Sequence, residues 1–218
     1  MSARLIVIAA PSGAGKTTLV NALLERNPDL RFSVSYTTRR KRPNEQEGRD
    51  YFFVTEERFL QLRDQGELLE SALVFDNYYG TSRSQVEAEL EQGHHVILEI
   101  DWQGAEQVRT ARPDCISVFI LPPSRSELER RLRGRRTDSD AVIARRLADA
   151  LGDMSHWDEF DYAIVNDDLA DSASRLEAII AGQGADNRLD HAPLRSRIGQ
   201  ILDGDRPQPP QTRLPSGR

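Results

Sequence analysis

The stretch "IAAPSGAGKTTL", residues 8–19, decides the fold because it joins two regular elements through a glycine-rich turn. The apolar run "RLIVIA", residues 4–9, leads into this turn and is typical of a buried strand. Residues 16–26 follow with the spacing of an amphipathic helix, and Pro28 cannot continue that helix. We expect its apolar face to consist of Leu19, Val20, Leu23 and Leu24. The chain therefore opens with a strand, a tight loop and a helix.

Residues 10–17, "APSGAGKT", match the Walker A pattern except that Ala10 replaces its usual first glycine. In such a loop the backbone amides and the next helix N-terminus point at one spot, which favours a phosphate group. An accidental glycine-rich turn is the alternative, but the flanking strand and helix are the context that the motif requires. We predict a nucleoside triphosphate site formed by Ala10, Pro11, Ser12, Gly13, Ala14, Gly15, Lys16 and Thr17.

Lys16 is one of only two lysines in a chain whose positive charge otherwise comes from arginine. A compact ammonium can sit inside a ring of amides and follow the β- and γ-phosphate oxygens, whereas a planar guanidinium is broad and directional. We therefore expect Lys16 to be a catalytic group. The hydroxyl of Thr17 is expected beside a Mg²⁺ ion that is bound with the nucleotide.

The composition excludes several other classes of protein. With 218 residues, of which 38% are hydrophobic and 29% charged, the chain is typical of a soluble protein with one sizeable core. Its net charge of −6 argues against a general nucleic-acid binder. The run "LIVIAA" is too short for a signal peptide or a membrane span, so we expect a cytoplasmic protein without a membrane partner. The single cysteine, Cys115, is expected to be a structural thiol, and the four histidines show no metal-ligand spacing.

Four apolar runs lack polar alternation and so indicate strands that are buried on both faces, as in a parallel sheet. They are "RLIVIA", "HVILEI", "ISVFIL" and "YAIV". Helical segments separate them. We therefore predict an α/β protein with the three-layer P-loop NTPase fold and a central parallel sheet, to which two smaller lobes are attached.

Polar residues mark the expected helix starts. Ser84 with Glu87, and Ser124 with Glu127, have the spacing of a capping box and predict helices that begin near residues 85 and 125. Three further helices are expected: one from Asp138 or Ser139 to about Met154, one from Asp167 or Asp168 to near Gly182, and a last one over residues 190–202. The Pro-rich end that follows is expected to be disordered.

Polar side chains at the end of one predicted strand are candidates for binding a substrate or a metal ion. In "VILEIDWQG" the acids Glu99 and Asp101 are two residues apart and so lie on the same side of the strand. Asp101 is a candidate for holding Mg²⁺ through water or for holding a substrate group. The alternative is that both acids cap the following turn.

The basic run "TTRRKRP" concentrates like charge between residues 39 and 42, which requires either solvent or an anion. Alone it would be a solvated loop, but acceptors and donors suited to a nucleotide follow it, namely Tyr51, Glu70, Tyr79 and Thr81. One carboxylate can accept both donors on the Watson–Crick edge of guanine, and a hydroxyl can donate to its carbonyl. Adenine presents the opposite pattern, so such a site would reject it.

Taken in order, seven segments between Arg4 and Gly182 resemble the motifs of the guanylate kinases: "APSGAGKT", "SVSYTTRRKRP", "GRDYFF", "NYYGTS", "LEIDWQG", "RRLRGR" and "IVNDD". The resemblance implies transfer of the γ-phosphoryl group of ATP to GMP, and also to dGMP, with Mg²⁺ bound to ATP. It implies a guanylate-kinase-like domain over residues 1–182, with a GMP-binding lobe at about 33–93 and a lid at about 123–148. Residues 183–218 would form the C-terminal helix and the Pro-rich tail.

The resemblance also implies roles for single residues. The GMP phosphate would be held by Arg39, Arg42, Tyr51 and Tyr79, and the guanine would be read or oriented by Ser35, Glu70, Thr81 and Asp101. The catalytic lid arginines would be Arg131, Arg135 and Arg146, with Asn166 near the adenine. In place of Glu99 the family usually has aspartate, so the reach of this acid differs. We assign Arg40 and Lys41 to solvent.

Three other functions are weighed against this one. An inactive guanylate-kinase-like interaction module usually damages the phosphate loop or the lid, whereas Lys16, Thr17 and the lid arginines all remain. A kinase for a ribose bisphosphate would not need Glu70 and Thr81. A P-loop GTPase would need an asparagine–lysine motif for guanine, and no lysine outside residues 16 and 41 exists to form one. The oligomeric state is left open.

Overall fold

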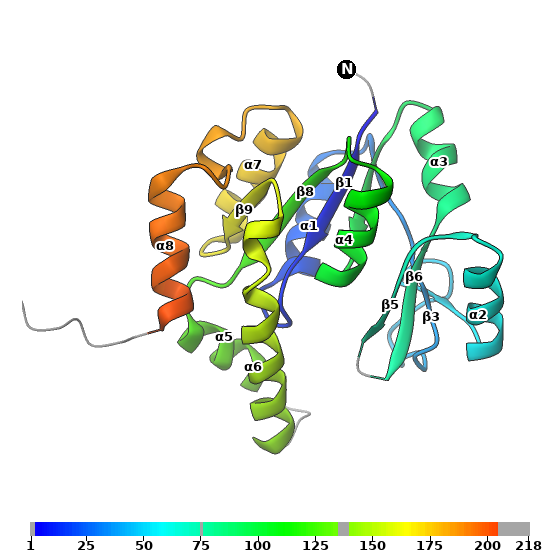
Figure 1. Ribbon diagram of the computed structural model, residues 1–218, viewed down its shortest axis with the longest axis horizontal. Helices are drawn as coiled ribbons and strands as arrows, with labels where there is room; N and C mark the ends of the chain where they lie inside the picture. The colour runs from blue at the N-terminus through cyan, green and yellow to red at the C-terminus, as the bar shows by residue number, and fades with distance from the viewer. Residues whose placement is uncertain (1–2, 75, 135–139, 205–218) are drawn as a thin grey trace, which may run out of the picture.

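The computed structural model describes residues 3–74, 76–134 and 140–204 (Figure 1). Its central sheet has five parallel strands in the order β2-β7-β1-β8-β9. The four strands predicted from apolar runs are confirmed as β1 (Leu5–Ala9), β7 (His95–Glu99), β8 (Ile116–Leu121) and β9 (Tyr162–Val165). The edge strand β2 (Leu30–Phe32) was not predicted, because its three half-exposed residues form no apolar run.

Helices cover both faces of this sheet and give three layers. On one face α1 (Lys16–Arg26) and α7 (Leu169–Ile180) share a buried cluster with Ile6 and Ile8 of β1. The other face carries α3 (Arg83–Glu91), α4 (Trp102–Ala111), α5 (Arg125–Arg133), α6 (Asp140–Met154) and α8 (Ala192–Asp203). Because successive side chains of β1 alternate between these clusters, both faces of the strand are apolar. The predicted α/β fold is confirmed.

A second sheet stands beside the first and is inserted between β2 and α3 (Figure 1). Its order is β4-β3-β6-β5, formed by β3 (Tyr36–Thr37), β4 (Phe52–Phe53), β5 (Leu68–Val74) and β6 (Asn77–Ser82). The helix α2 (Glu56–Asp64) packs on it through Phe59 and Leu62, which form a small separate core with Leu68. This insertion therefore has its own apolar centre.

Of the predicted helix caps, two are confirmed, one is wrong and one lies outside the described residues. Ser124 caps α5 and Asp168 caps α7, each accepting a hydrogen bond from a backbone amide of the first turn. For α3 the predicted cap Ser84 is wrong. Its cap is Ser82, whose hydroxyl accepts from the amide of Gln85, because β6 runs directly into the helix. The predicted caps of α6, Asp138 and Ser139, lie outside the described residues.

Two short 3₁₀ turns flank the last strand and helix of the core: Trp157–Glu159 lies before β9, and Ala185–Asn187 lies between α7 and α8. The predicted last helix is therefore confirmed. Its buried residues Leu194, Ile198 and Ile201 join the same core as α5 and α6. Residues 205–218 of the predicted Pro-rich tail lie outside the described part of the chain. None of the described helices is long and apolar enough to cross a membrane.

Candidate active site

The site begins where two adjacent parallel strands end. Ile8 of β1 pairs in register with Glu99 of β7, so the loop after β1 and the segment after β7 emerge side by side. Clefts at the carboxyl ends of such strands are the usual ligand sites of open α/β sheets. The phosphate loop and the acids Glu99 and Asp101, which were predicted separately, are thereby brought together.

The phosphate loop turns through two glycines in the left-handed region, Gly13 at φ 91° and Gly15 at φ 92°. Gly15 is also crowded, because a side-chain Cβ there would lie 2.7 Å from Nδ2 of Asn166. Glycine meets both demands. The loop leads directly into α1 at Lys16, as the sequence predicted, and the first turn of α1 contains no acidic residue that would oppose an anion.

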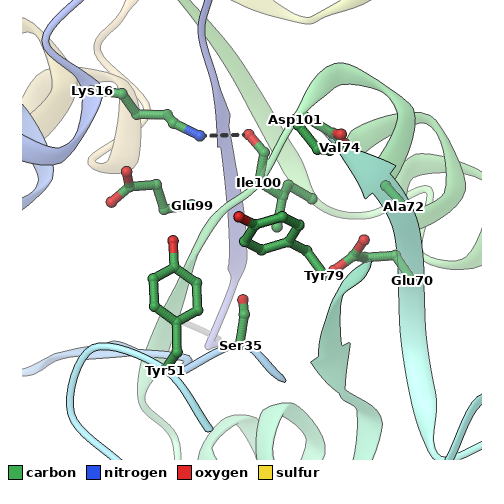
Figure 2. Close-up of a pocket in the computed structure, with 10 residues that line it drawn as sticks. All are labelled: Lys16, Ser35, Tyr51, Glu70, Ala72, Val74, Tyr79, Glu99, Ile100 and Asp101. Carbon is green, nitrogen blue, oxygen red and sulfur yellow. Dashed lines mark hydrogen bonds between the residues drawn. The ribbon is translucent and has the colours of Figure 1, made fainter. Parts of the chain in front are cut away.

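Lys16 extends from this helix start toward the segment after β7. Its Nζ donates a hydrogen bond of 2.7 Å to the carbonyl oxygen of Ile100 (Figure 2). Burial lowers the pKa of the ammonium, while the negative charges of Glu99 and Asp101 oppose that change. The backbone carbonyl thus holds the ammonium between the phosphate loop and the cavity beside it.

Thr17 and Glu99 are paired at the mouth of the loop. The Thr17 hydroxyl donates to Oε1 of Glu99, so the longer side chain at position 99 reaches the loop threonine directly. A hydroxyl and a carboxylate are oxygen donors of the kind that Mg²⁺ prefers, and Mg²⁺ in such sites is held by one or two protein groups plus substrate phosphates. Among the described residues no group of three or more His, Cys, Asp or Glu side chains could hold a metal alone. The pair therefore fits an ion that is shared with the nucleotide.

Two side chains that were predicted to lie near ATP, Asn166 and Arg131, donate hydrogen bonds to the backbone of the phosphate loop. The Ala14 carbonyl accepts hydrogen bonds from Asn166 Nδ2 at 2.8 Å and from Arg131 Nη1 at 3.1 Å. Arg131 in turn donates at 2.8 Å to Glu127, four residues earlier on α5. Arg146 lies on α6 with a half-buried side chain. Arg135, the third predicted lid arginine, lies outside the described residues.

On the far side of the cleft Glu70 lies at the end of a cavity of about 190 Å³ (Figure 2). Only 4% of this residue is exposed, and its Oε1 accepts a 2.7 Å hydrogen bond from the hydroxyl of Thr81, which is fully buried. Burial raises the pKa of Glu70 to about 7. The same cavity is lined by Lys16, Ser35, Tyr51, Ala72, Val74, Tyr79, Glu99, Ile100 and Asp101.

Asp101 has the structural role that the sequence left open. Its Oδ1 accepts a hydrogen bond of 2.7 Å from the amide of Gly104 and so caps α4. The residue also lines the cavity between Lys16 and Glu70. It can therefore cap the helix and face a substrate at the same time.

The four residues predicted to hold the GMP phosphate, here called the clamp, are Arg39, Arg42, Tyr51 and Tyr79. The guanidinium carbon of Arg39 lies 5.4 Å from the centre of the Tyr51 ring, and the ring of Tyr79 meets that of Tyr51 edge-on at 5.9 Å. Burial raises the pKa of Tyr51 to about 12, so its phenol stays protonated and can donate a hydrogen bond. These three predicted residues thus face one region.

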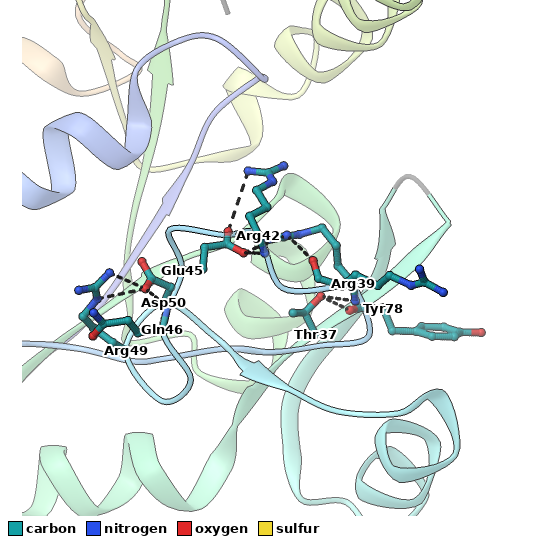
Figure 3. A network of polar contacts seen from close by, with 9 residues as sticks. Thr37, Arg39, Arg42, Glu45, Gln46, Arg49, Asp50 and Tyr78 are labelled. Carbon is teal, nitrogen blue, oxygen red and sulfur yellow. Dashed lines mark hydrogen bonds and ion pairs between the residues drawn. The ribbon is translucent and has the colours of Figure 1, made fainter. Parts of the chain in front are cut away.

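Glu45 is a neighbour of this clamp that the sequence analysis missed. Its two carboxylate oxygens accept from Arg39 at 2.7 and 3.1 Å, and its Oε2 also accepts from the backbone amide of Arg42 at 2.7 Å (Figure 3). The pair is largely buried, with side chains 16% and 15% exposed, and Arg39 holds the pKa of Glu45 below its usual value. An acid three residues beyond a basic run was the available signal. Arg40 and Lys41 are exposed, as expected.

The family model for guanylate kinase matches residues 2–183. The chain belongs to the guanylate kinase family. It is 53% identical over 203 residues to the guanylate kinase of Aromatoleum aromaticum, covering 93% of this chain and 98% of that one. It is 49% identical over 198 residues to the guanylate kinase of Pseudomonas fluorescens, covering 91% and 94% of the two chains.

A solved structure supports the fold of this guanylate kinase family member. The crystal structure of guanylate kinase from Anaplasma phagocytophilum matches with a TM-score of 0.71 and 38% identity, over 84% of this chain and 87% of that one. The predicted P-loop NTPase fold is thereby confirmed. The resemblance that the seven sequence segments indicated is confirmed as well, and a nucleotide-binding phosphotransferase is what the family relationship supports.

Proposed function

We propose that the protein is an ATP:GMP phosphotransferase that moves the γ-phosphoryl group of ATP to a phosphate oxygen of GMP and so forms ADP and GDP. The observation that carries the proposal is that one cavity has Lys16 of the phosphate loop at one side and the buried Glu70 at the other. A single ligand in this cavity can present its base to Glu70 and its phosphate toward Lys16.

In this proposal Glu70 reads guanine. Its ionised carboxylate accepts the ring N–H and the exocyclic amine, while Thr81 fixes its orientation through Oε1. Because the Thr81 proton is directed at Glu70, the hydroxyl of Ser35 is the better placed donor for the guanine carbonyl. Asp101 closes the remaining wall. An adenine would leave these buried groups unpaired, which is the basis of its rejection.

The acceptor phosphate lies against the clamp of Arg39, Arg42, Tyr51 and Tyr79. Glu45 occupies part of the Arg39 guanidinium, and the donors that remain are available to a phosphate. The protonated phenol of Tyr51 adds a neutral donor beside the cation. The clamp would therefore hold the acceptor phosphate through the free donors of Arg39 and the neutral phenol of Tyr51, beside the Glu45 carboxylate, and would place the acceptor oxygen in line with the γ-phosphate.

The donor phosphates lie in the loop formed by residues 10–17, with Lys16 on the β- and γ-phosphates, and the lid arginines Arg131, Arg135 and Arg146 would supply further positive charge to these phosphates. The Thr17 hydroxyl, and Asp101 through water, would hold a Mg²⁺ ion together with ATP, and the ion would supply charge neutralisation. A GMP phosphate oxygen is already anionic at neutral pH, so no general base is needed. Catalysis then rests on positioning and on reducing the repulsion between two polyanions.

An assay that couples ADP release to a signal tests this function. Purified protein with ATP and Mg²⁺ would be given GMP, dGMP, AMP, CMP or UMP in turn. We expect rapid turnover with GMP, measurable turnover with dGMP, and rates at least about 10²-fold lower with the other three. Equal rates with AMP and GMP, or none with GMP, would contradict the proposal. The activity would place the protein in cytoplasmic purine nucleotide metabolism, where it returns GMP to GDP.

A kinase for a ribose bisphosphate is not favoured, because such an acceptor has no base to engage the buried Glu70 and Thr81. An inactive interaction module is not favoured either, because the phosphate loop retains Lys16 and Thr17 in the geometry described above.

A further inference from the structure

We propose that Gly104, in the first turn of α4, sets the discrimination for the base by leaving the space that the Glu70 carboxylate occupies, and that Gln107 fixes the strand carrying Glu70. The inference rests on the proposed function, since it concerns how Glu70 is aimed at guanine. Neither residue touches the substrate in this proposal. Both are positioning residues.

Gly104 lies too close to the acids of the cavity for any side chain to fit there unless they move. A Cβ at this position would lie 2.5 Å from Oε2 and 3.1 Å from Cδ of Glu70, and 3.2 Å from Oδ1 of Asp101. Real Cβ atoms essentially never approach another heavy atom to within 3.0 Å. The missing side chain therefore lets the carboxylate lie directly against the helix. The backbone amide of the same residue donates a hydrogen bond of 2.7 Å to Oδ1 of Asp101, so Gly104 helps to position both Glu70 and Asp101.

Gln107, one turn later on α4, ties the helix to the strand that carries Glu70. Its Oε1 accepts from the backbone amide of Ser71 at 3.1 Å, and its Nε2 donates to the carbonyl of Ser71 at 2.9 Å. The side-chain amide thus pairs with β5 as a neighbouring strand would, at the residue that follows Glu70. Because backbone donors and acceptors pair strongly, these two hydrogen bonds fix the position of β5 along α4. Helix and strand together determine where Oε2 points.

The first experiment measures kcat/KM for GMP and for IMP, which has the same ring N–H and carbonyl but lacks the exocyclic amine. The displaced atom is the far end of a flexible side chain, so the variant Gly104→Ala is expected to fold, with its carboxylate pushed aside. We expect kcat/KM for GMP to fall by at least about tenfold and the GMP/IMP ratio to fall with it, because GMP loses two hydrogen bonds and IMP one. The KM for ATP should stay within twofold.

The matched control is Gly199→Ala, since this glycine also lies in a helix and a Cβ there would meet nothing within 4 Å. It should leave every kinetic value unchanged. A second arm is Gln107→Glu, which keeps the size and one acceptor but cannot donate to Ser71. It should raise the KM for GMP without changing the KM for ATP, and it decides the question for β5 even if Gly104→Ala failed to fold.

The decisive arm is the pair Gly104→Ala and Glu70→Asp, analysed as a double-mutant cycle. Aspartate is shorter by one methylene, so it should not meet the new methyl group. We therefore expect Gly104→Ala to cost less than threefold in the Glu70→Asp background, against tenfold or more in the wild type. An equal cost in both backgrounds, or an unchanged GMP/IMP ratio in Gly104→Ala, would overturn the inference. Wild-type protein that makes no GDP would instead overturn the proposed function.

Discussion

The two ends of the cavity differ in how far apart in the sequence their parts lie. The phosphate loop is one continuous segment of residues 10–17, and its geometry follows from two glycines and a helix start. The base end is assembled from β5, β6, α4 and the segment after β2, so Glu70 is positioned by Thr81, eleven residues away, and by Gly104. A local motif thus specifies the binding of a phosphate, whereas long-range packing specifies which base is accepted.

The largest effect is expected at the phosphate loop, the end of the cavity that a single segment of the chain forms. Lys16→Ala removes the ammonium that bridges the donor phosphates, so kcat should fall about 10⁴-fold, while circular dichroism and the melting temperature remain close to those of the wild type. Lys41→Ala is the matched control, since this exposed residue is the only other lysine, and it should retain full activity. Turnover by Lys16→Ala at the wild-type rate would remove the loop from the chemistry.

At the other end Glu70→Gln keeps the shape of the side chain but replaces one acceptor by a donor. We expect kcat/KM for GMP to fall about 10²- to 10³-fold, with KM for ATP within twofold, because one guanine donor loses its acceptor and faces a second donor. Steady-state kinetics with each substrate varied in turn measures both. Glu67→Gln, an exposed neighbour on the same insertion, serves as the control. If KM for ATP rose as much as KM for GMP, the two ends would not be separable.

The pH dependence of kcat/KM for GMP tests the role of Glu70 in the wild-type protein. Glu70 must be ionised to accept both guanine donors, and its pKa is raised to about 7 by burial. Activity with GMP should therefore be lost as the pH falls through 7, and kcat/KM should rise about tenfold between pH 6 and pH 8. The substrate phosphate also titrates near pH 6. The profile of Glu70→Gln corrects for it, and a rise of equal size in that variant would contradict the assignment.

Much of the phosphate loop and of the helices could be predicted from the sequence, whereas less of the part of the cavity that binds the base could be. The strand, loop and helix around Lys16, the caps Ser124 and Asp168, and the pair Glu127–Arg131 follow from short-range spacing. Gly104 could not be interpreted from its neighbours, because the atom that requires the glycine comes from β5. Glu45 was missed for a related reason, since the acid lies in an exposed-looking charged loop and only the fold buries it against Arg39.

A smaller effect is expected at Glu45, which holds Arg39 but does not read the base. Glu45→Gln leaves one acceptor and removes the charge, so the guanidinium is less firmly oriented. We expect KM for GMP to rise about fivefold, which corresponds to about 1 kcal/mol, with kcat unchanged. The control Asp64→Asn removes an exposed partner of Arg63 on α2 and should have no effect. A fall in KM for Glu45→Gln would show instead that this carboxylate competes with the phosphate.

The smallest effect is expected at Cys115, which precedes the amino end of β8, whereas the site lies at the carboxyl ends of the strands. The thiol is buried, and burial raises its pKa to about 11, so it is almost entirely protonated at neutral pH. Cys115→Ala should leave kcat and both KM values within twofold. Titration of the native protein with a thiol reagent at pH 7 should show slow reaction compared with the unfolded chain. Rapid reaction accompanied by loss of activity would contradict a purely structural thiol.

The measurement that tests the separation of the two ends most directly is calorimetric titration of GMP into three proteins: the wild type, Lys16→Ala and Glu70→Gln. We expect Lys16→Ala to bind GMP within about threefold of the wild-type affinity, although it does not turn over, and Glu70→Gln to lose at least about 10²-fold in affinity. GMP binding that survives in Glu70→Gln and disappears in Lys16→Ala would contradict it.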